Sequence, residues 1–204
     1  MNFSKGILIA TTNKGKTKEI SEILISSFKN SKNAPIKIFS PYDLNCVDLK
    51  VEENGKTFKD NALIKARAYA QKSGLVTLAD DSGLEVDFLS AAPGVQSARY
   101  AGVGAGDKAI VDKLLLEMKP APFEKRRARF ICVVCVYDPI SKESIFAEGE
   151  CPGHIGFDAK GKNGFGYDPV FIPDGYTLTM AELNPDIKNS ISHRARALHN
   201  LSLF

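Results

Sequence analysis

Short apolar runs alternate along this chain with segments in which apolar residues recur at helical spacing. The runs expected to form strands are 6–10, 36–39, 75–79, 128–137 and 144–150. The segments expected to form helices are 17–28, the stretch from Thr57 to Gly74, 107–118 and a final helix that carries Ile191, Ala195, Leu198 and Leu201. Strands interleaved with helices, with a late hairpin formed by the last two strands, predict an α/β protein with a mixed sheet. A polar loop is expected from 80 to 106, interrupted by an apolar patch at 86–89.

Length and charge narrow the class of protein. At 204 residues the chain is expected to form one domain with a sizeable core. Its net charge of +3 suits a protein that handles an anionic small molecule, and it is far from the strongly basic balance of nucleic-acid-binding proteins. No apolar stretch is long enough to span a bilayer. We expect the run 6–10 to be a buried strand rather than part of a signal peptide, because no small-residue cleavage site follows it.

Cys132 and Cys135 form a C-x-x-C pair, a pattern that can indicate a zinc or redox site. They lie in the β-branched run 128–137, and residues three apart on a strand point to opposite faces, so one metal ion could not easily bind both. Cys46 and Cys151 add no second C-x-x-C, and no His pair stands at zinc-finger spacing. We therefore expect buried, reduced thiols, which favour a cytoplasmic protein.

A polar turn from Thr11 to Lys16 joins the first expected strand to the first expected helix. Backbone N–H groups at the start of a helix, together with the positive end of the helix dipole, can bind an anion. Lys14, Lys16 and the hydroxyls of Thr11 and Thr12 add donors for phosphate. The turn does not fit the G-x-x-x-x-G-K-[ST] pattern of P-loop proteins, and the alternative interpretation is a solvated turn.

Two adjacent carboxylates, Asp80 and Asp81, follow the third expected strand. Acidic side chains at the carboxyl end of a strand are well placed for a crevice site. Neighbouring carboxylates are unfavourable without a cation, and Mg²⁺, which prefers oxygen ligands, would relieve this repulsion. A second acidic pair, Glu52 and Glu53 just before Gly55, could add a carboxylate from a distant segment. The alternative is a polar turn, because Asp, Ser and Gly all favour turns.

The third polar region begins with the glycine loop 163–171 and continues into basic residues downstream. Glycines on both sides of Phe165 allow the backbone to approach a ligand and leave an aromatic face for stacking. Lys188, His193 and Arg194 offer donors for a base carbonyl or for phosphate. The alternative is a glycine loop followed by a helix with ordinary surface charge.

Taken in order, these segments resemble the inosine triphosphate pyrophosphatase family, the Ham1-like enzymes that hydrolyse non-standard purine nucleoside triphosphates. The resemblance covers nearly the whole chain. The matching motifs are Thr11-x-Asn13-x-x-Lys16-x-x-Glu19, Ala79-Asp-Asp-Ser-Gly-Leu84, Pro93-Gly-Val-Gln-Ser-Ala-Arg-Tyr100, Gly164-Phe-Gly-Tyr-Asp-Pro-Val-Phe171 and Lys188-Asn-Ser-Ile-Ser-His-Arg194. One local departure is Lys160 before Gly161, where the family would have an arginine. Lysine keeps the charge but lacks the bidentate fork.

The resemblance implies a long mixed central sheet flanked by helices, in a single domain of two lobes that spans 1–204, with a nucleotide cleft between the lobes. It also implies a homodimer and a Mg²⁺ cofactor. Asp81 would be the proton acceptor and, with Glu52, a Mg²⁺ ligand. The residues implied to bind the substrate are Thr11, Thr12, Asn13, Lys14, Gly15, Lys16, Ser82, Phe165, Gly166, Tyr167, Asp168, Lys188, His193 and Arg194.

The expected reaction is hydrolysis of ITP, dITP or XTP to the monophosphate and pyrophosphate, which would remove these nucleotides before their incorporation into DNA and RNA. Attack at the α-phosphorus would release pyrophosphate, and attack at the β-phosphorus stays open. Donors from His193, Arg194 or the nearby backbone would satisfy a C6 carbonyl and would meet another donor in adenine, a mismatch worth ~10⁴-fold in discrimination. Two alternatives remain: a pyrophosphatase for other nucleotides, such as modified pyrimidine triphosphates, and a non-catalytic nucleotide- or RNA-binding module. No membrane partner and no stable nucleic-acid partner are expected.

Overall fold

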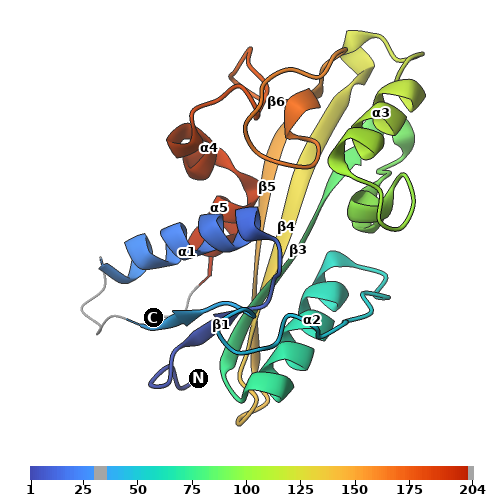
Figure 1. The fold of residues 1–204 in the computed structure, drawn as a ribbon. Helices are drawn as coiled ribbons and strands as arrows, with labels where there is room; N and C mark the ends of the chain where they lie inside the picture. Colours follow the sequence, from blue (N-terminus) through green and yellow to red (C-terminus); the bar gives the residue numbers. More distant parts are fainter. Residues whose placement is uncertain (30–35, 202–204) are drawn as a thin grey trace. The chain divides into compact units, whose positions relative to one another are not determined.

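The computed structural model describes residues 1–29 and 36–201, and for 27–29 it describes the backbone only. These residues contain a six-stranded sheet with strand order β2-β1-β3-β4-β5-β6 (Figure 1). The strands are β1 Ile7–Ile9, β2 Ile38–Phe39, β3 Val76–Val86, β4 Arg127–Tyr137, β5 Ser144–Ile155 and β6 Phe171–Pro173. The helices are α1 Lys14–Lys29, α2 Phe58–Ser73, α3 Asp107–Glu117, α4 Pro185–Ile191 and α5 His193–His199.

The sheet is mixed, as the interleaved sequence pattern predicts. Strand β1 pairs in parallel with both β2 and β3, whereas β5 and β6 pair antiparallel. Strands β4 and β5 are neighbours joined by a short turn, so the expected late hairpin is confirmed. The predicted α/β class with a mixed sheet flanked by helices is therefore confirmed.

The chain forms two compact units. Unit 1 contains Met1–Asp81, Cys132–Gly149 and the chain from Arg194 onward, and unit 2 contains Ser82–Ile131 and Glu150–His193. Each unit has its own apolar core, and strands β3, β4 and β5 contribute one part to each unit. The expected single domain of two lobes with a nucleotide cleft stays a prediction.

Unit 1 has an apolar cluster on each side of its part of the sheet. One cluster joins alternate strand residues such as Ile7, Leu78 and Cys132 with residues of α1 and α5. The other joins the intervening residues such as Leu8 and Cys135 with the apolar side of α2. The two cysteines of the C-x-x-C pair therefore face opposite sides of β4, as predicted for a strand. All four cysteines are buried, and none of them forms a disulfide.

Helix α2 begins and ends where its sequence signals predict. The Thr57 side chain accepts a hydrogen bond from the Asp60 N–H, and the Asp60 side chain accepts one from the Thr57 N–H, which completes a capping box. Gly74 ends the helix in the left-handed conformation, with φ of 71°. This fixed start decides which side chains of α2 point to the sheet.

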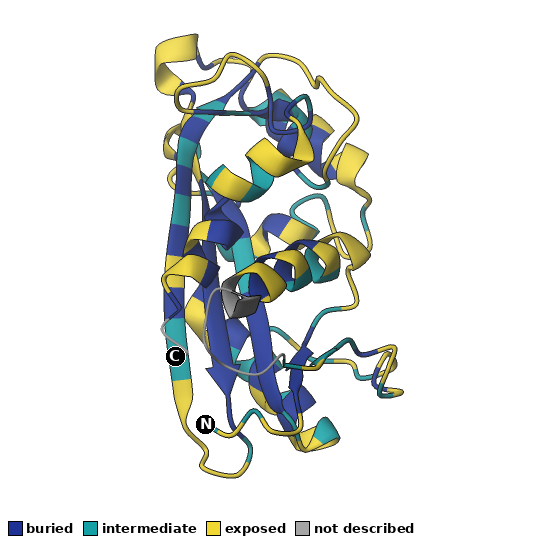
Figure 2. Ribbon diagram, turned by 90° about the vertical axis from the view of Figure 1, so that its left-hand side faces the viewer, coloured by how far each residue is buried: buried dark blue, intermediate teal, exposed yellow. Residues whose placement is uncertain are grey.

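Strand β3 is longer than predicted, and this corrects the expected loop from 80 to 106. The strand continues through both aspartates to Val86, and short 3₁₀ segments at Asp87–Leu89 and Gly94–Arg99 follow it. Leu84 and Val86 are fully buried in the core of unit 2, so the second half of β3 is held by packing rather than by β-propensity. Figure 2 shows the resulting long buried strands as dark blue runs.

The final helix is also corrected, because the chain breaks at Ser192 into α4 and α5. Ser192 has extended backbone angles (φ −64°, ψ 150°) and separates Ile191 from the apolar residues of α5. Ile191 packs in unit 2, whereas Ala195, Leu198 and Leu201 pack in unit 1, so the four expected apolar residues serve two cores. None of the helices within 1–29 and 36–201 has the length and apolar composition needed to cross a bilayer.

Candidate active site

The polar turn before α1 has the properties of an anion site. The Asn13 side chain accepts a hydrogen bond from the Lys16 N–H at 3.1 Å, and the Asn13 carbonyl accepts one from the Thr17 N–H at 2.9 Å. Thr12, Lys14 and Gly15 are exposed. The first turn of α1 carries no acidic residue, so no carboxylate there competes with an incoming phosphate for the positive end of the helix.

Asp80 is fully buried and is surrounded by cations. Its Oδ2 accepts hydrogen bonds from Lys16 Nζ at 3.0 Å and from Arg194 Nε at 3.1 Å. Burial alone would raise the pKa of Asp80, but the charges of Lys16, Arg194 and Lys65 hold this pKa far below its usual value. Asp80 is therefore ionised at neutral pH and anchors Lys16 and Arg194.

Asp81, the next residue, lies in the opposite electrostatic situation. It is partly exposed, and burial together with the Glu53 carboxylate raises its pKa, against the opposing effects of Lys65 and a hydrogen bond from Asn61. Two neighbouring carboxyl groups whose pKa values are shifted in opposite directions are typical of a division between an anchor and a proton acceptor. The role of Asp81 as proton acceptor stays a prediction.

Asn61 joins Asp81 to the acidic segment before α2. Its Nδ2 donates to Asp81 Oδ2 at 3.0 Å, and its Oδ1 accepts from the Gly55 N–H at 2.8 Å. The Gly55 N–H can only donate, which fixes the orientation of the amide. The two acidic segments, which the sequence left unconnected, are thus linked through one buried side chain.

Lys65 is a second cation at this place and was missed by the sequence reasoning. Its Nζ forms an ion pair with Glu53 Oε2 at 2.8 Å and donates to the Asp80 carbonyl at 3.0 Å. Burial lowers the pKa of Lys65, but the carboxylates of Glu53, Asp80 and Asp81 raise it overall, so this ammonium stays charged. Asn61 and Lys65 are four residues apart on α2, which places them on one helix face, and this spacing was the available signal.

Carboxylate oxygens are the ligand type that Mg²⁺ prefers, and the candidate carboxylates here are Asp81, Glu52 and Glu53. Glu52, the ligand implied by the resemblance, is exposed, whereas Glu53 is occupied by Lys65. Among the residues that the structure describes, no group of three or more His, Cys, Asp or Glu side chains is placed to hold a metal ion. Mg²⁺ is usually bound by one or two carboxylates, with substrate phosphates and water as the other ligands. Asp81 and Glu52 have the oxygen donors that this pattern uses, and their binding of Mg²⁺ as a pair stays a prediction.

Gly55 offers a direct test of the link through Asn61. A Cβ at this position would lie 2.6 Å from Asp60 Cβ and 2.7 Å from Asn61 Oδ1. We expect Gly55→Ala to push the Asn61 amide away from Asp81 and to lower kcat/KM for nucleotide hydrolysis by roughly tenfold to a hundredfold. Steady-state kinetics would measure this change. The matched control is Gly106→Ala, because a Cβ there meets nothing within 4 Å, and an equal loss in both variants would contradict the link.

The glycine loop of unit 2 is organised by Asp168. This buried carboxylate accepts hydrogen bonds from the Phe165 N–H at 2.8 Å and from Lys188 Nζ at 2.7 Å. The Lys188 ammonium also lies 4.9 Å from the centre of the Phe165 ring. A Cβ on Gly164, which has a φ of 77°, would lie 2.0 Å from Asp168 Oδ2, so the close turn requires glycine. An aromatic ring, an ammonium and a carboxylate are thereby held together in unit 2.

The other predicted substrate residues of unit 2 differ in exposure. Tyr167 is buried and donates to the Ser97 carbonyl at 2.9 Å, and the Gly166 N–H donates to Asp107 Oδ2 at 2.8 Å. His193 is buried, with its ring stacked on Phe130 at 4.7 Å between centres. Ser82 is half-buried in β3.

Arg194 belongs to unit 1 and is 1% exposed, with Nη1 donating to Glu19 Oε2 at 2.7 Å in addition to its bond with Asp80. The structure therefore places Arg194 among the carboxylates, while its predicted contact with the substrate stays a prediction. Lys160, where an arginine was expected, is exposed.

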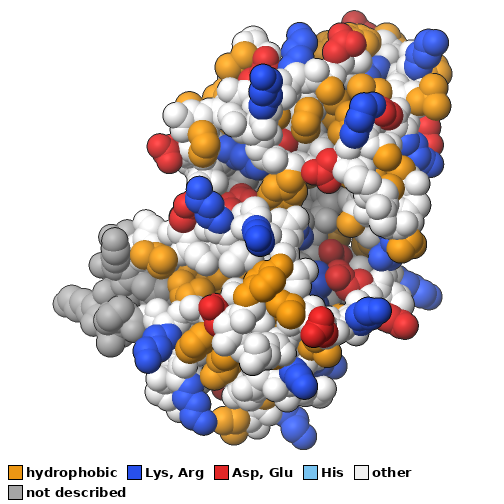
Figure 3. All heavy atoms as spheres, in the orientation of Figure 1, with side chains coloured by type: hydrophobic (Ala, Val, Ile, Leu, Met, Phe, Trp, Pro, Cys, Tyr) orange, Lys and Arg blue, Asp and Glu red, His pale blue; other side chains and the backbone are white. Residues whose placement is uncertain are grey.

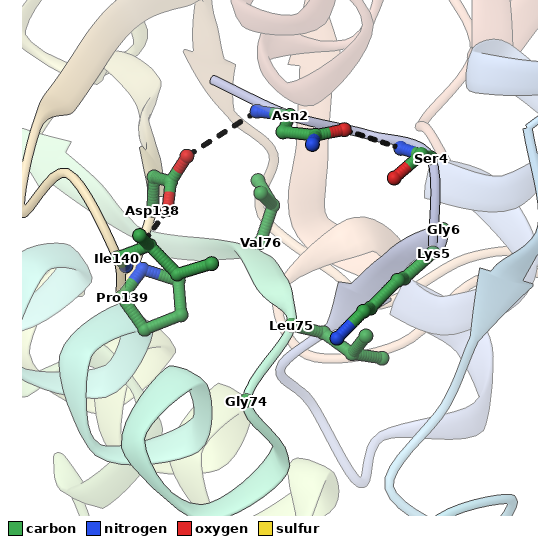
Figure 4. A pocket seen from close by; sticks show the side chains of 10 residues that line it. All are labelled: Asn2, Ser4, Lys5, Gly6, Gly74, Leu75, Val76, Asp138, Pro139 and Ile140. Atoms are coloured by element: carbon green, nitrogen blue, oxygen red, sulfur yellow. Dashed lines mark hydrogen bonds between the residues drawn. The ribbon is translucent and has the colours of Figure 1, made fainter.

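A small pocket at the N-terminal side of unit 1 contains none of the predicted site residues (Figure 4). It is lined by backbone near Gly6 and Gly74 and by Asp138. The carboxylate of Asp138 accepts hydrogen bonds from the backbone N–H groups of Asn2, at 3.3 Å, and Ile140, at 2.8 Å, which tie the segment before β1 to the turn after β4.

Known proteins share this fold and sequence over nearly their whole length. The Ham1 family model matches residues 7–204. Relatives named dITP/XTP pyrophosphatase from Oceanobacillus iheyensis and Haemophilus influenzae are each 46% identical to this chain. The first match covers 97% of this chain and 96% of the relative, and the second covers 94% of both.

Solved structures agree with the sequence comparison. The structure of a HAM1 protein from Coxiella burnetii has a TM-score of 0.81 and 39% identity, and the match covers 95% of this chain and 94% of that one. The crystal structure of a nucleoside-triphosphatase / dITP/XTP pyrophosphatase from Mycobacterium abscessus has a TM-score of 0.75 and 40% identity, with coverage of 98% and 100%. The family model and the relatives together show that this chain belongs to the Ham1 family.

Proposed function

We propose that this protein hydrolyses the non-standard purine nucleoside triphosphates ITP, dITP and XTP to the monophosphate and pyrophosphate. The observation that carries the proposal is the pair Asp80 and Asp81, in which one carboxyl is a permanent anion beside Lys16 and the other has a raised pKa. The names of the similar proteins, which are dITP/XTP pyrophosphatases, support the choice of substrate. Removal of these nucleotides would prevent their incorporation into DNA and RNA.

The chemistry follows from the residues of unit 1. The turn from Thr11 to Lys16 binds the triphosphate through backbone N–H groups, hydroxyls and ammonium groups. Asp81 accepts a proton from a water molecule, whose oxygen forms a new bond to the α-phosphorus as the bond to the bridging oxygen breaks. Pyrophosphate leaves, and Lys65 and Lys16 offset the negative charge that develops on the phosphate oxygens.

We propose Mg²⁺ as the cofactor, which Asp81 and Glu52 would hold. When bound, it supplies Lewis-acid polarisation of the phosphate groups. Lys65 keeps Glu53 engaged and leaves the exposed Glu52 available for this purpose. We also propose a homodimer and a cytoplasmic location, which rest on the resemblance and on the reduced cysteines.

Base selection is assigned to the residues of unit 2. Phe165 offers a face for stacking, and Lys188 can donate to the C6 carbonyl of hypoxanthine or xanthine, whereas the amino group of adenine would meet it as another donor. His193 and Arg194, which the sequence offered for this task, are buried in contacts with other protein groups. Lys188, which is held by Asp168 and lies beside Phe165, is therefore the donor we favour.

The test is pyrophosphate release from ITP, dITP, XTP, ATP, GTP and dTTP, each with and without Mg²⁺. We expect metal-dependent release from the first three and discrimination against ATP of up to ~10⁴-fold. Release from dTTP instead would assign the specificity to pyrimidine triphosphates, and no release from any nucleotide would contradict the proposal. In ¹⁸O-labelled water, label in the monophosphate would place the attack at the α-phosphorus, and label in the pyrophosphate would place it at the β-phosphorus.

A nucleic-acid-binding role is less well supported. On the face that Figure 3 shows, lysine and arginine side chains are interspersed with acidic ones and form no continuous basic stripe among the described residues. Such a stripe is what backbone recognition of RNA or DNA requires.

A further inference from the structure

Four charged side chains of unit 1 are linked by three ion pairs beside the turn from Thr11 to Lys16, and the backbone of α1 closes them into a ring. Lys16 bonds to Asp80 at 3.0 Å, Asp80 to Arg194 at 3.1 Å, and Arg194 to Glu19 at 2.7 Å. Glu19 stands three residues after Lys16 on α1, one turn along the helix, so the ring begins and ends on that helix. Glu19, Asp80 and Arg194 are 5%, 1% and 1% exposed.

The ring is better explained by orientation than by stability. Removing charges from water is costly, and a buried ion pair often adds no net stability over an apolar replacement. The ring instead fixes the orientation of its side chains. Arg194 donates from Nε to Asp80 and from Nη1 to Glu19, and this fixes the angle between the two carboxylates. Asp80 in turn holds the long, flexible Lys16 side chain in one position.

We propose that Glu19 and Arg194 are positioning residues that act through Asp80 to hold the Lys16 ammonium ready for the triphosphate. An ammonium that is already oriented loses less conformational entropy when a phosphate binds. The inference rests on the proposed function, since it assigns Lys16 to phosphate binding. It gives a functional reason for Glu19, whose carboxylate is buried against Arg194.

The test measures the affinity for inorganic triphosphate by calorimetry at fixed ionic strength. In the wild-type background, Glu19→Gln is expected to weaken binding by about tenfold, a change typical of coupled charged residues. In a Lys16→Met background, the same substitution is expected to change the affinity by less than about twofold, because the residue through which Glu19 acts is gone. A purely structural role would weaken binding by the same factor in both backgrounds.

The matched control is Glu22→Gln on the same helix. Glu22 is exposed and pairs with Lys18 at 3.9 Å, so its replacement should leave the affinity unchanged. If Glu19→Gln does not fold, Arg194→Lys serves in the same two backgrounds, because it keeps the charge and loses the two-nitrogen geometry.

The outcomes separate this inference from the proposed function. Equal effects in both backgrounds, no effect in the wild-type background, or no triphosphate binding by the wild-type protein would overturn the inference. Lack of pyrophosphate release from any nucleotide, with the background-dependent effect intact, would overturn the proposed reaction but leave the ring as a phosphate-binding device. In the active enzyme, Glu19→Gln should lower kcat/KM for dITP by about tenfold, because Lys16 contacts the phosphates both in the bound substrate and as charge develops on them.

Discussion

Replacing Asp81 with asparagine should lower kcat for pyrophosphate release by about 10³-fold, because an amide of the same shape cannot accept a proton from water. The Asn61 Nδ2 that now donates to Asp81 at 3.0 Å can still donate to the new amide oxygen, so the local structure should persist. Steady-state kinetics with dITP and Mg²⁺ would measure the loss. Turnover near that of the wild type in a folded Asp81→Asn protein would remove Asp81 from the role of general base.

The same substitution should not reduce stability. Burial and the Glu53 carboxylate raise the pKa of Asp81, so its ionised form is less favourable in the folded chain than in the unfolded one. At pH 7 and without Mg²⁺, Asp81→Asn should therefore have a free energy of unfolding equal to or above that of the wild type. As the pH falls through the raised pKa, the wild type becomes protonated and the difference should disappear. Urea denaturation at several pH values would check this.

Asp80→Asn is the second substitution with a large expected effect. Unlike Asp81→Asn, it should lower the free energy of unfolding. It leaves the partly exposed Lys16 and the buried Arg194 next to a neutral amide, and breaking a buried charge pair such as that of Asp80 and Arg194 costs about 3–5 kcal/mol. The depressed pKa of Asp80 sets the pH dependence: its contribution is complete above the ordinary value of 3.8 and is lost as the pH falls below it. The difference in unfolding free energy between wild type and Asp80→Asn should thus be full at pH 7 and shrink in acid.

The two variants act as controls for each other, because the substitution is chemically the same at adjacent positions. Denaturation curves should separate them in one experiment, with Asp80→Asn less stable and Asp81→Asn at least as stable as the wild type. Equal destabilisation of both would contradict the division into an anchor and a proton acceptor. Such a division also illustrates how a catalytic group is kept at some expense of stability.

Local sequence signals predicted the elements they control. The capping box at Thr57 and Asp60 and the terminal Gly74 are short-range features, and the structure confirms them. The opposite orientation of Cys132 and Cys135 follows from the two-residue period of a strand, and it too is confirmed.

Features that depend on packing were not predictable in the same way. Residues 80–83 look like a turn by composition, yet burial of Leu84 and Val86 keeps β3 extended through them. Likewise, one apolar helical pattern around Ser192 serves two different cores. Which core a side chain joins is decided by the tertiary structure and not by the spacing of apolar residues.

The sequence identified the motifs of the candidate site, but it did not identify which side chains contact them. The motif from Thr11 to Glu19 and the two aspartates were identified, and the structure gives a purpose to Glu19 that the pattern alone did not. Lys65 and Asn61 were missed because a lysine and an asparagine on a helix are ordinary residues until the strand they face is known. The sequence offered Arg194 as a donor for a base carbonyl or for phosphate, and only the structure reveals the two carboxylates that it joins.

The ring of Lys16, Asp80, Arg194 and Glu19 contains two cations and two anions, so its charges cancel. A nucleotide that approaches through solvent is therefore not attracted by Lys16 until it is nearly in contact. The long-range attraction that speeds association must come from exposed groups such as Lys14, whose field salt screens. The association rate constant of the nucleotide should thus depend on ionic strength. The dissociation rate constant should depend on it far less, because the bound phosphate contacts a group whose charge is already compensated within the ring.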